Sequence, residues 1–396
     1  MNKELTATAA PQPQAGTVYS IQVLRGVAAV LVMLFHYSRY LKPVVPGSDI
    51  GYSLFGGGYM GVDIFFIISG FIIVHSTARP EHARPLDFLI RRFFRVVPIA
   101  QVATLVYFAI IFTRPPLGLL FKSLCFLPSE DIDPPKFGYP VVPQEWTLSY
   151  ELLFYGLFAA ALVFTHRRRV VLCALAILGC VIGLQWALGG PISFRPNAVF
   201  LPSRRVDFAP AEVIGLAGNP IMLDFIAGML LASAYRAKDA WLHSGARNAA
   251  RAFGTMMIGV FAFCYLSPVR PGNGLLDKGL GALCLVAGSL LIELTLPGAK
   301  PPRRSKGIFA AFLWLGTISY TLYLVHQGIS ERLLRFLASL FFGVKVDGLP
   351  GFLSLILLSL ALASGAHVFL ERAFIWVGKR LTSPRGSHVR AAGLGA

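Results

Sequence analysis

Charged residues are scarce in this sequence of 396 residues, since Asp, Glu, Lys and Arg together make up only 14% of it. Soluble domains contain roughly a quarter charged residues, so the shortage excludes a soluble enzyme as well as a disordered or fibrous chain. Acidic residues are the scarcer class, with 19 Asp and Glu against 36 Lys and Arg. Hydrophobic residues make up 55% and the mean hydropathy is +0.65. This composition is typical of a protein with many membrane spans.

Cysteine is scarce as well, and its spacing gives no sign of a ligand set. Five cysteines stand at positions 125, 173, 180, 264 and 284, with no CxxC pair among them. This excludes a disulfide framework. We predict that the cysteines are apolar packing residues and that the protein binds no metal.

The amino-terminal segment lacks the features of a cleavable signal peptide. Residues 1–17 are polar and rich in Pro and Gln, and no small-residue cleavage site follows the first apolar run. We therefore predict that this run stays as a membrane helix. We also predict that 1–17 and 378–396 are disordered cytoplasmic ends around a single transmembrane domain, 18–377.

Ten apolar segments have about the length needed to cross a bilayer as a helix, which is about 20 residues. The sequence therefore predicts an all-α, polytopic integral membrane protein with about ten transmembrane helices. The predicted spans are 18–40, 58–78, 94–113, 146–165, 170–188, 219–236, 251–267, 278–296, 313–340 and 351–377.

Basic residues are concentrated in alternate loops, which predicts how the spans are oriented. Cytoplasmic loops are enriched in Lys and Arg, so both termini are predicted to be cytoplasmic. The basic excess is then a consequence of membrane topology, and we predict no nucleic-acid partner. The loops after the even-numbered spans contain Arg79, Arg84, Arg91, Arg167, Arg168, Arg169, Arg236, Lys238, Arg247, Arg251, Lys300, Arg303, Arg304 and Lys306.

Ionisable residues inside predicted spans are costly to bury and therefore indicate function. In the first span, Arg25 and His36 are eleven residues apart. This is about three helical turns, so both residues face the same way, roughly 16 Å apart along the axis. One helix face then offers a cation nearer the cytoplasm and a titratable base nearer the outer side. Alternatively, Arg25 extends to the membrane surface and His36 is an interfacial histidine with satisfied hydrogen bonds.

The second span contains Asp63 near its outer end, at a depth similar to that of His36, and the pair Ser69 and Gly70 further along. Small residues allow close helix approach, so we predict structural roles for Ser69 and Gly70. Asp63 either orients the imidazole of His36 or caps the span, and we favour a structural role.

The third span opens with Arg92 and Arg95, one turn apart on the same face. Arginines beside the free backbone N–H groups of a helix start form a phosphate site, which predicts contact with an anionic substrate. The alternative is that they only anchor the cytoplasmic end of the span, the role we predict for Arg91.

The fourth and ninth spans add further polar groups. Trp146 fits an outer interfacial belt, and Glu151 and Tyr155 are one turn apart on one face. A carboxylate at that depth needs an imidazole, hydroxyl or guanidinium as its partner. In the ninth span, Tyr323 and His326 share a face and are predicted to contact the substrate, with helix packing as the alternative.

Five distinctive motifs follow one another along the chain. They are Leu24-Arg25-Gly26 with Phe35-His36-Tyr37, Gly61-Val-Asp-Ile-Phe-Phe-Ile-Ile-Ser-Gly-Phe71, Arg92-Phe-Phe-Arg95, Trp146-Thr-Leu-Ser-Tyr-Glu151 and Ser319-Tyr-Thr-Leu-Tyr-Leu-Val-His326. In this order, over about 18–377, the chain resembles the acyltransferase-3 family of integral-membrane acyltransferases. The resemblance is closest to the ExoZ-type branch, which O-acetylates bacterial exopolysaccharide.

The resemblance implies a multi-pass protein of the bacterial inner membrane. It implies acetyl-CoA or another acyl-CoA as the donor, supplied from the cytoplasm, and a polysaccharide or lipid-linked glycan as the acceptor. The essential histidine of the family falls on His36 and its arginine in the first span on Arg25. Its R-x-x-R motif falls on Arg92 and Arg95, and its acid in the fourth span on Glu151.

From these features we predict a membrane O-acetyltransferase in which His36 acts as general base on the acceptor hydroxyl. Glu151 is predicted to orient His36 or to stabilise its imidazolium. The tetrahedral oxyanion needs hydrogen-bond donors, for which Tyr155, Tyr323 and Arg25 are all candidates. An acyl group carried by His36 itself is an alternative to direct transfer.

Other functions stay open at this point. A transporter or flippase could use the same buried charges as a substrate path, and a scaffold or sensor would tolerate their replacement. The acceptor could instead be a lipid or peptidoglycan. The sequence does not decide the acyl chain length, the position acylated or whether the chain forms a homo-oligomer.

Overall fold

The structure is a computed structural model that describes residues 18–382 except 45–48, 81–82, 112–114, 131–132, 188–191, 199–209, 268–271, 297–306 and 342–346. The described residues are helical and contain no strand, which confirms the predicted all-α fold. The α-helices are α1 (Tyr19–Tyr37), α2 (Ile50–Phe55), α3 (Gly61–Ser76), α4 (Pro85–Ile110), α5 (Leu117–Leu124), α6 (Trp146–Phe164), α7 (Arg169–Leu178), α8 (Leu184–Ala187), α9 (Ala211–Ala217), α10 (Leu223–Arg236), α11 (Lys238–Trp241), α12 (Arg247–Leu266), α13 (Gly279–Thr295), α14 (Ile308–Val325), α15 (Ile329–Phe341), α16 (Gly348–Ala366) and α17 (Arg372–Thr382). The π-helical turns Gly179–Gly183 and His367–Glu371 join α7 to α8 and α16 to α17.

Nine helical segments of the described chain are long and apolar enough to cross a membrane, which confirms a polytopic membrane protein. The eighth predicted span corresponds to α13, an apolar helix of only 17 residues. The nine segments are Tyr19–Lys42, Ile50–Ser76, Pro85–Ile110, Pro143–Phe164, Arg169–Ala187, Ala211–Arg236, Arg247–Leu266, Ile308–Val325 and Gly348–Thr382.

The ninth predicted span, 313–340, is wrong in its extent. Helix α14 ends at Val325, and a separate helix, α15, begins at Ile329. Three charged residues within α15 make this helix amphipathic, so it does not continue an apolar span.

The ends of two other predicted segments also differ from the structure. The third span was predicted to begin at 94, whereas α4 begins at Pro85, a residue type favoured at the first helical position. The final helix continues to Thr382, past the predicted domain end at 377. The rest of the predicted tail, 383–396, and the predicted disordered start, 1–17, lie outside the described residues.

Glycines bring together the helices that carry the motifs. A Cβ atom added to Gly26 of α1 would lie 2.7 Å from the backbone N of Gly316 in α14. A Cβ atom added to Gly70 of α3 would lie 2.3 Å from the carbonyl O of Phe225 in α10. Only glycine allows such close backbone approach, so α1 packs on α14 and α3 packs on α10.

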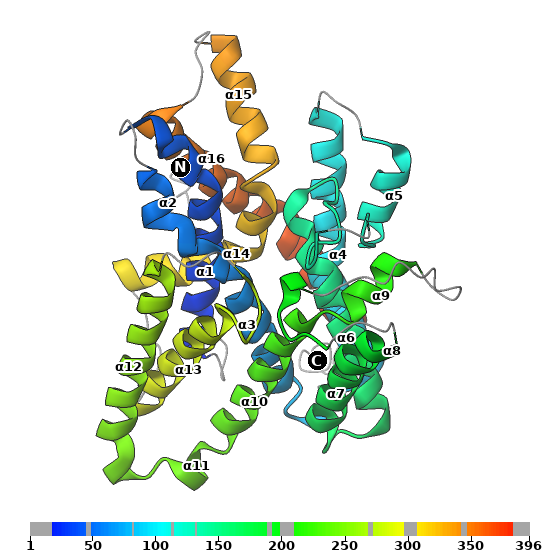
Figure 1. The fold of residues 1–396 in the computed structure, drawn as a ribbon, viewed down its shortest axis with the longest axis vertical. Helices are drawn as coiled ribbons and strands as arrows, with labels where there is room; N and C mark the ends of the chain where they lie inside the picture. The colour runs from blue at the N-terminus through cyan, green and yellow to red at the C-terminus, as the bar shows by residue number, and fades with distance from the viewer. Residues whose placement is uncertain are drawn as a thin grey trace, which may run out of the picture.

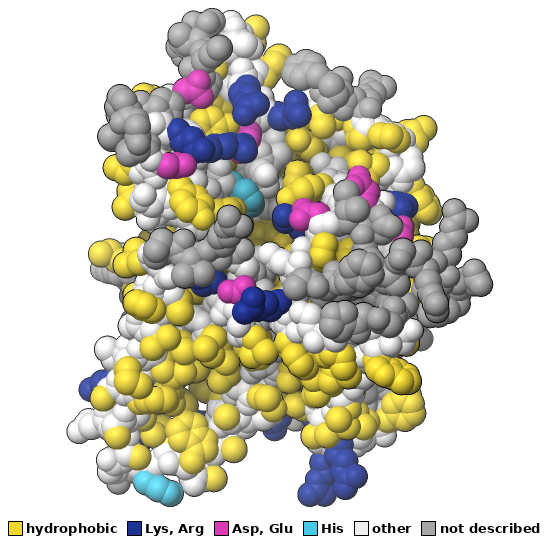
Figure 2. All heavy atoms as spheres, in the orientation of Figure 1, with side chains coloured by type: hydrophobic (Ala, Val, Ile, Leu, Met, Phe, Trp, Pro, Cys, Tyr) yellow, Lys and Arg dark blue, Asp and Glu magenta, His cyan; other side chains and the backbone are white. Residues whose placement is uncertain are grey.

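Helices α3 and α10 form the centre of the bundle, and 78% of the apolar window is buried in each of their spans. In Figure 1, α4, α6 and α7 lie on one side of this centre and α1, α12, α13 and α14 on the other. Helix α12 lies at the edge, with 6% of its window buried. Hydrophobic side chains dominate the lower half of the face shown in Figure 2, as expected of a surface that contacts lipid.

Candidate active site

Two cavities lie among α1, α3, α4, α6 and α14. The first, which we call the arginine cavity, has a volume of about 80 Å³, and its lining includes Arg25, Ser69, Arg92, Arg95, Glu151 and Tyr155. The second, the histidine cavity, has a volume of about 610 Å³, and its lining includes His36, Tyr59, Gln144, Trp146, Asn273 and Gln327. Val62 and Tyr323 line both cavities, so the two spaces adjoin.

Three guanidinium groups meet at the arginine cavity. Arg92 donates to Ser76 Oγ at 3.1 Å, and its guanidinium carbon lies 5.7 Å from the ring centroid of Tyr155. Arg25 and Arg95 make no hydrogen bond with another described residue. Both side chains are half-buried, so their guanidinium donors are available to an anionic or carbonyl-bearing ligand in the cavity.

The counter-charge in this cavity is smaller than the positive charge. Glu151 accepts hydrogen bonds from Ser69 Oγ at 3.0 Å and from the Tyr155 hydroxyl. It is the one acid among the described residues that line the cavity, although Glu371 also acts electrostatically on Arg25. Three arginines therefore line this cavity together with one carboxylate.

The predicted phosphate site at a helix start is wrong in one respect. Because α4 begins at Pro85, Arg92 and Arg95 lie about two turns or more inside the helix. Backbone N–H groups at that depth are already used within the helix. Only the guanidinium groups are left to bind an anion.

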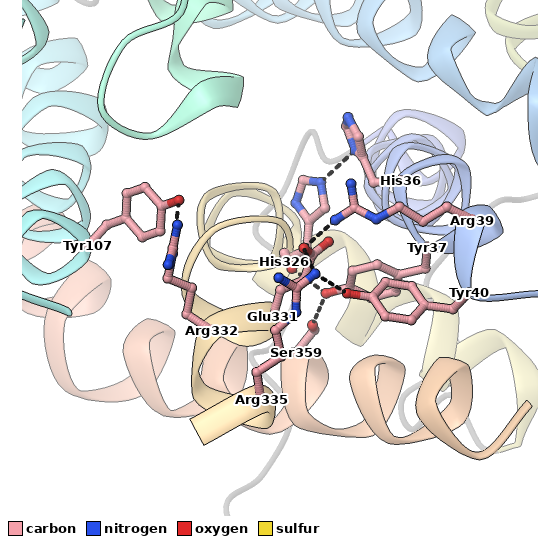
Figure 3. A network of polar contacts seen from close by, with 10 residues as sticks. All are labelled: His36, Tyr37, Arg39, Tyr40, Tyr107, His326, Glu331, Arg332, Arg335 and Ser359. Atoms are coloured by element: carbon pink, nitrogen blue, oxygen red, sulfur yellow. Dashed lines mark hydrogen bonds and ion pairs between the residues drawn. The ribbon is translucent and has the colours of Figure 1, made fainter. Parts of the chain in front are cut away.

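His36 lines the histidine cavity, and its ring contacts the ring of His326, as Figure 3 shows. His36 Nδ1 lies 3.0 Å from His326 Nε2. His326 Nδ1 lies 2.8 Å from the carbonyl O of Tyr323 and 3.2 Å from that of Leu322. A carbonyl can only accept, so Nδ1 of His326 carries the proton and its Nε2 accepts. His36 must then donate from Nδ1, and its Nε2 is left as an unprotonated base.

A second set of contacts holds His326 in place. The Tyr37 hydroxyl donates to the carbonyl O of His326 and lies 2.6 Å from Ser359 Oγ of α16. His326 is completely buried. It contacts the ring of His36 and lines neither cavity, so this arrangement does not support the predicted contact between His326 and the substrate.

The prediction that Glu151 orients His36 is not supported by the arrangement of the described residues. Glu151 lines the arginine cavity with Arg25, whereas His36 lies about three turns further along α1 and lines the other cavity. The sequence could not show that a second histidine, on α14, reaches His36 instead.

Tyr323 and Trp146 border the histidine cavity. The Tyr323 hydroxyl lies 3.1 Å from Thr147 Oγ1 and 3.2 Å from the carbonyl O of Gln144, which it can donate to. The Trp146 ring meets the Tyr150 ring edge to face, with centroids 6.0 Å apart. Tyr323 thus lies at the junction of the two cavities.

Asp63 has a structural position and does not contact His36. It accepts hydrogen bonds from Asn273 Nδ2 at 2.8 Å and from the backbone N of Gly274 at 2.5 Å. The buried carboxyl group of Asp224 acts on Asp63 electrostatically, and its two oxygens have no hydrogen-bond partner among the described residues. Asp63 therefore holds the loop before α13 against α3, which positions Asn273 in the lining of the histidine cavity.

Sequence reasoning missed Asn273 and Gln327 in this lining. Both are uncharged, and neither follows a helical pattern that would single it out. It also missed Arg39, which follows His36 by three residues and pairs with Glu331 of α15. Burial raises the pKa of Glu331, an effect that Arg39 opposes.

Comparison with known proteins gives a family match over most of the chain. A model of the family described as "Acyltransferase domain" matches residues 18–368. The exopolysaccharide production protein ExoZ of Rhizobium meliloti (strain 1021) is 28% identical over 351 residues, which cover 85% of this chain and 95% of ExoZ. The putative membrane-bound transacylase BcsY of Komagataeibacter xylinus is 30% identical over 172 residues, which cover 39% of this chain and 40% of BcsY. No solved structure matches.

Proposed function

The chain belongs to the acyltransferase-3 family of membrane proteins, and from this we propose that it transfers an acetyl or other short acyl group from acyl-CoA to a hydroxyl of an exported or cell-surface polysaccharide. One observation carries this proposal. A cavity lined by three arginines adjoins a cavity that contains an unprotonated histidine nitrogen, with Val62 and Tyr323 between them.

The arginine cavity is our proposed donor side. Its volume of about 80 Å³ is far too small for a nucleotide and accommodates only a short part of the thin pantetheine arm at a time. Arg92 and Arg95 would bind the CoA phosphates at its opening, and Arg25 would contact the arm within the cavity. The arm would pass between Val62 and Tyr323, which brings the thioester into the histidine cavity.

The histidine cavity is our proposed acceptor side. Its volume of about 610 Å³ accommodates a sugar unit, and its lining offers Gln144, Trp146 and Asn273 for polar and stacking contacts. We propose that it opens to the outer side of a bacterial inner membrane. The concentration of basic residues in the loops at the opposite end supports this orientation.

The chemistry requires a base, because a sugar hydroxyl is a weak nucleophile at neutral pH. The hydroxyl oxygen attacks the thioester carbonyl while its proton passes to His36 Nε2. The carbon–sulfur bond then breaks, and the CoA thiolate takes up this proton. Arg25 lies about three turns from His36 on α1, whereas Tyr323 lines both cavities. We therefore propose that the Tyr323 hydroxyl donates to the oxyanion in exchange for its hydrogen bond to the carbonyl O of Gln144.

The proposal is tested with membranes that contain the protein, labelled acetyl-CoA and polysaccharide from the host strain. We expect label in the polysaccharide as base-labile ester. A His36→Ala variant that inserts at normal levels should lose at least about 100-fold of this activity. Undiminished transfer by that variant would contradict the catalytic role of His36. Passage of an unmodified substrate across the membrane without use of acetyl-CoA would instead favour a transporter.

A further inference from the structure

Two arginines converge on one buried carboxylate next to the histidine pair. Arg39 forms an ion pair with Glu331, and Arg335 lies 3.9 Å from the same carboxylate oxygen. The side chains of Arg39 and Arg335 are 47% and 62% exposed, whereas that of Glu331 is 8% exposed. One buried acid thus holds two guanidinium groups that still face solvent. We call these three residues the arginine rim.

The break between α14 and α15 creates this rim. The uninterrupted span predicted over 313–340 would have placed Glu331 and Arg335 within the bilayer. Because α14 ends at Val325, both residues instead lie on a separate helix beyond the span. Basic residues at this end are not explained by cytoplasmic orientation, since the proposed function puts this end on the outer side.

The rim lies close to the proposed reacting centre. Arg39 follows His36 by three residues, a rise of roughly 5 Å along the axis. In Figure 3 the Arg39 guanidinium lies between the His36 side chain and Glu331. Among the described residues Arg39 makes one hydrogen bond, to Glu331, although a guanidinium has five N–H donors, so most of its donors are open to a ligand.

The other cations near the rim have partners that lie away from His36. Lys42 is paired with Asp49 at 3.3 Å, and the exposed Asp347 acts on Arg335 electrostatically. Arg332 points the other way, with its Nε 3.4 Å from the Tyr107 hydroxyl on α4. Figure 2 shows a histidine side chain visible on this face, below a group of Lys and Arg side chains.

We propose that the acceptor is anionic, and that the arginine rim binds an acidic group of the acceptor beside the sugar that receives the acyl group. This inference rests on the proposed function and names its substrate class. A planar guanidinium binds a carboxylate or phosphate through paired hydrogen bonds, and Glu331 holds Arg39 ready for this geometry. The acidic group belongs either to a sugar carboxylate or to the diphosphate of a lipid-linked glycan, and we favour the carboxylate because the histidine cavity is lined for sugar.

The test compares acceptors that differ only in charge. Polysaccharide from the host strain is used as extracted and after chemical reduction of its carboxyl groups, with labelled acetyl-CoA and membranes containing the full-length protein. We expect the KM for the reduced polymer to be about tenfold higher or more, with similar incorporation at saturation. Galacturonate oligosaccharides should compete with the native polymer, whereas neutral galactose oligosaccharides should not.

Variants then assign the effect to the rim. Arg39→Gln should raise the KM for the native polymer about tenfold and leave the reduced polymer unaffected. If the single variant inserts poorly, the double variant Arg39→Gln/Glu331→Gln replaces it, because it leaves no buried acid without its partner Arg39. We expect the same rise in the KM for the native polymer. Arg332→Gln is the matched control, because Arg332 lies next to Glu331 on α15 but faces Tyr107 of α4, and its loss should change neither KM.

Each outcome bears on the inference. The inference would be overturned if the native and the reduced polymer had equal KM values and if phosphatase treatment of a lipid-linked acceptor did not change its KM. The acyltransferase proposal would stay intact in that case. If carboxyl reduction has no effect but phosphatase treatment of a lipid-linked acceptor raises its KM, the rim binds an anion and that anion is phosphate. No ester formation with any acceptor would instead contradict the proposed function.

Discussion

His36 Nδ1 lies 3.0 Å from Nε2 of His326, and the two backbone carbonyls around Nδ1 of His326 determine which nitrogen of each ring carries a proton. This contact joins α1 to the end of α14, two helices far apart in the sequence. It leaves Nε2 of His36 free to accept a proton. His326 is therefore a positioning residue for the proposed base.

Replacing His326 tests this relationship. His326→Ala should lower kcat by about tenfold or more with little change in the KM for acetyl-CoA. The reason is that His36 loses the acceptor that fixes its proton on Nδ1, whereas the donor site is unchanged. His326→Gln should recover part of the loss, since its amide oxygen can accept from His36 Nδ1. Initial rates over a range of acetyl-CoA concentrations separate the two constants. A rise in KM alone, or no recovery with glutamine, would contradict this role.

The arginine cavity predicts how donor affinity depends on charge. Arg95→Gln should raise the KM for acetyl-CoA about tenfold, because one of three cations that face the donor is lost. Arg91→Gln is the control on the same helix, because Arg91 does not line this cavity. Labelled acetyl-CoA binding to membranes provides a second measurement. Equal affinity of the two variants for acetyl-CoA would show that Arg95 does not bind the donor.

The junction between the cavities predicts a steric block. Val62 lines both cavities, so Val62→Phe should close the path and reduce transfer while binding of CoA persists. Val62→Ala widens the same point and should retain transfer. Both variants are compared for membrane insertion and for binding and transfer of labelled acetyl-CoA. Full transfer by the phenylalanine variant would mean that the acyl group does not pass Val62.

Helix contact at glycine predicts a stability difference. In Gly70→Ala the new Cβ would lie 2.3 Å from the carbonyl O of Phe225, which forces α3 and α10 apart and costs about 1–3 kcal/mol. Gly156→Ala in α6 meets nothing within 4 Å and should be neutral or stabilise by about 0.5–1 kcal/mol. Thermal unfolding of the detergent-solubilised variants measures both. Equal melting temperatures would contradict the packing described.

Much of the architecture followed from hydropathy alone, because each span must be apolar over its own length. The exceptions have local causes. Helix α13, of 17 residues, is shorter than the other spans, and α15 separates from α14 because charged residues make it amphipathic. The predicted span 313–340 placed Glu331 and Arg335 inside the membrane, whereas in the structure they lie on α15 and form part of the arginine rim.

The sequence by itself determined that His36 and Arg25 share a face of one apolar helix, because helical periodicity depends only on spacing along the chain. It also determined that Glu151 and Tyr155 form a pair, since they are one turn apart. Only the tertiary structure decided that Glu151 belongs with the arginines and that His326 is the partner of His36. The histidine contact depends on how α1 and α14 approach through Gly26 and Gly316, and the position of Glu151 depends on how α6 packs on α4. No periodicity within one helix specifies its neighbour.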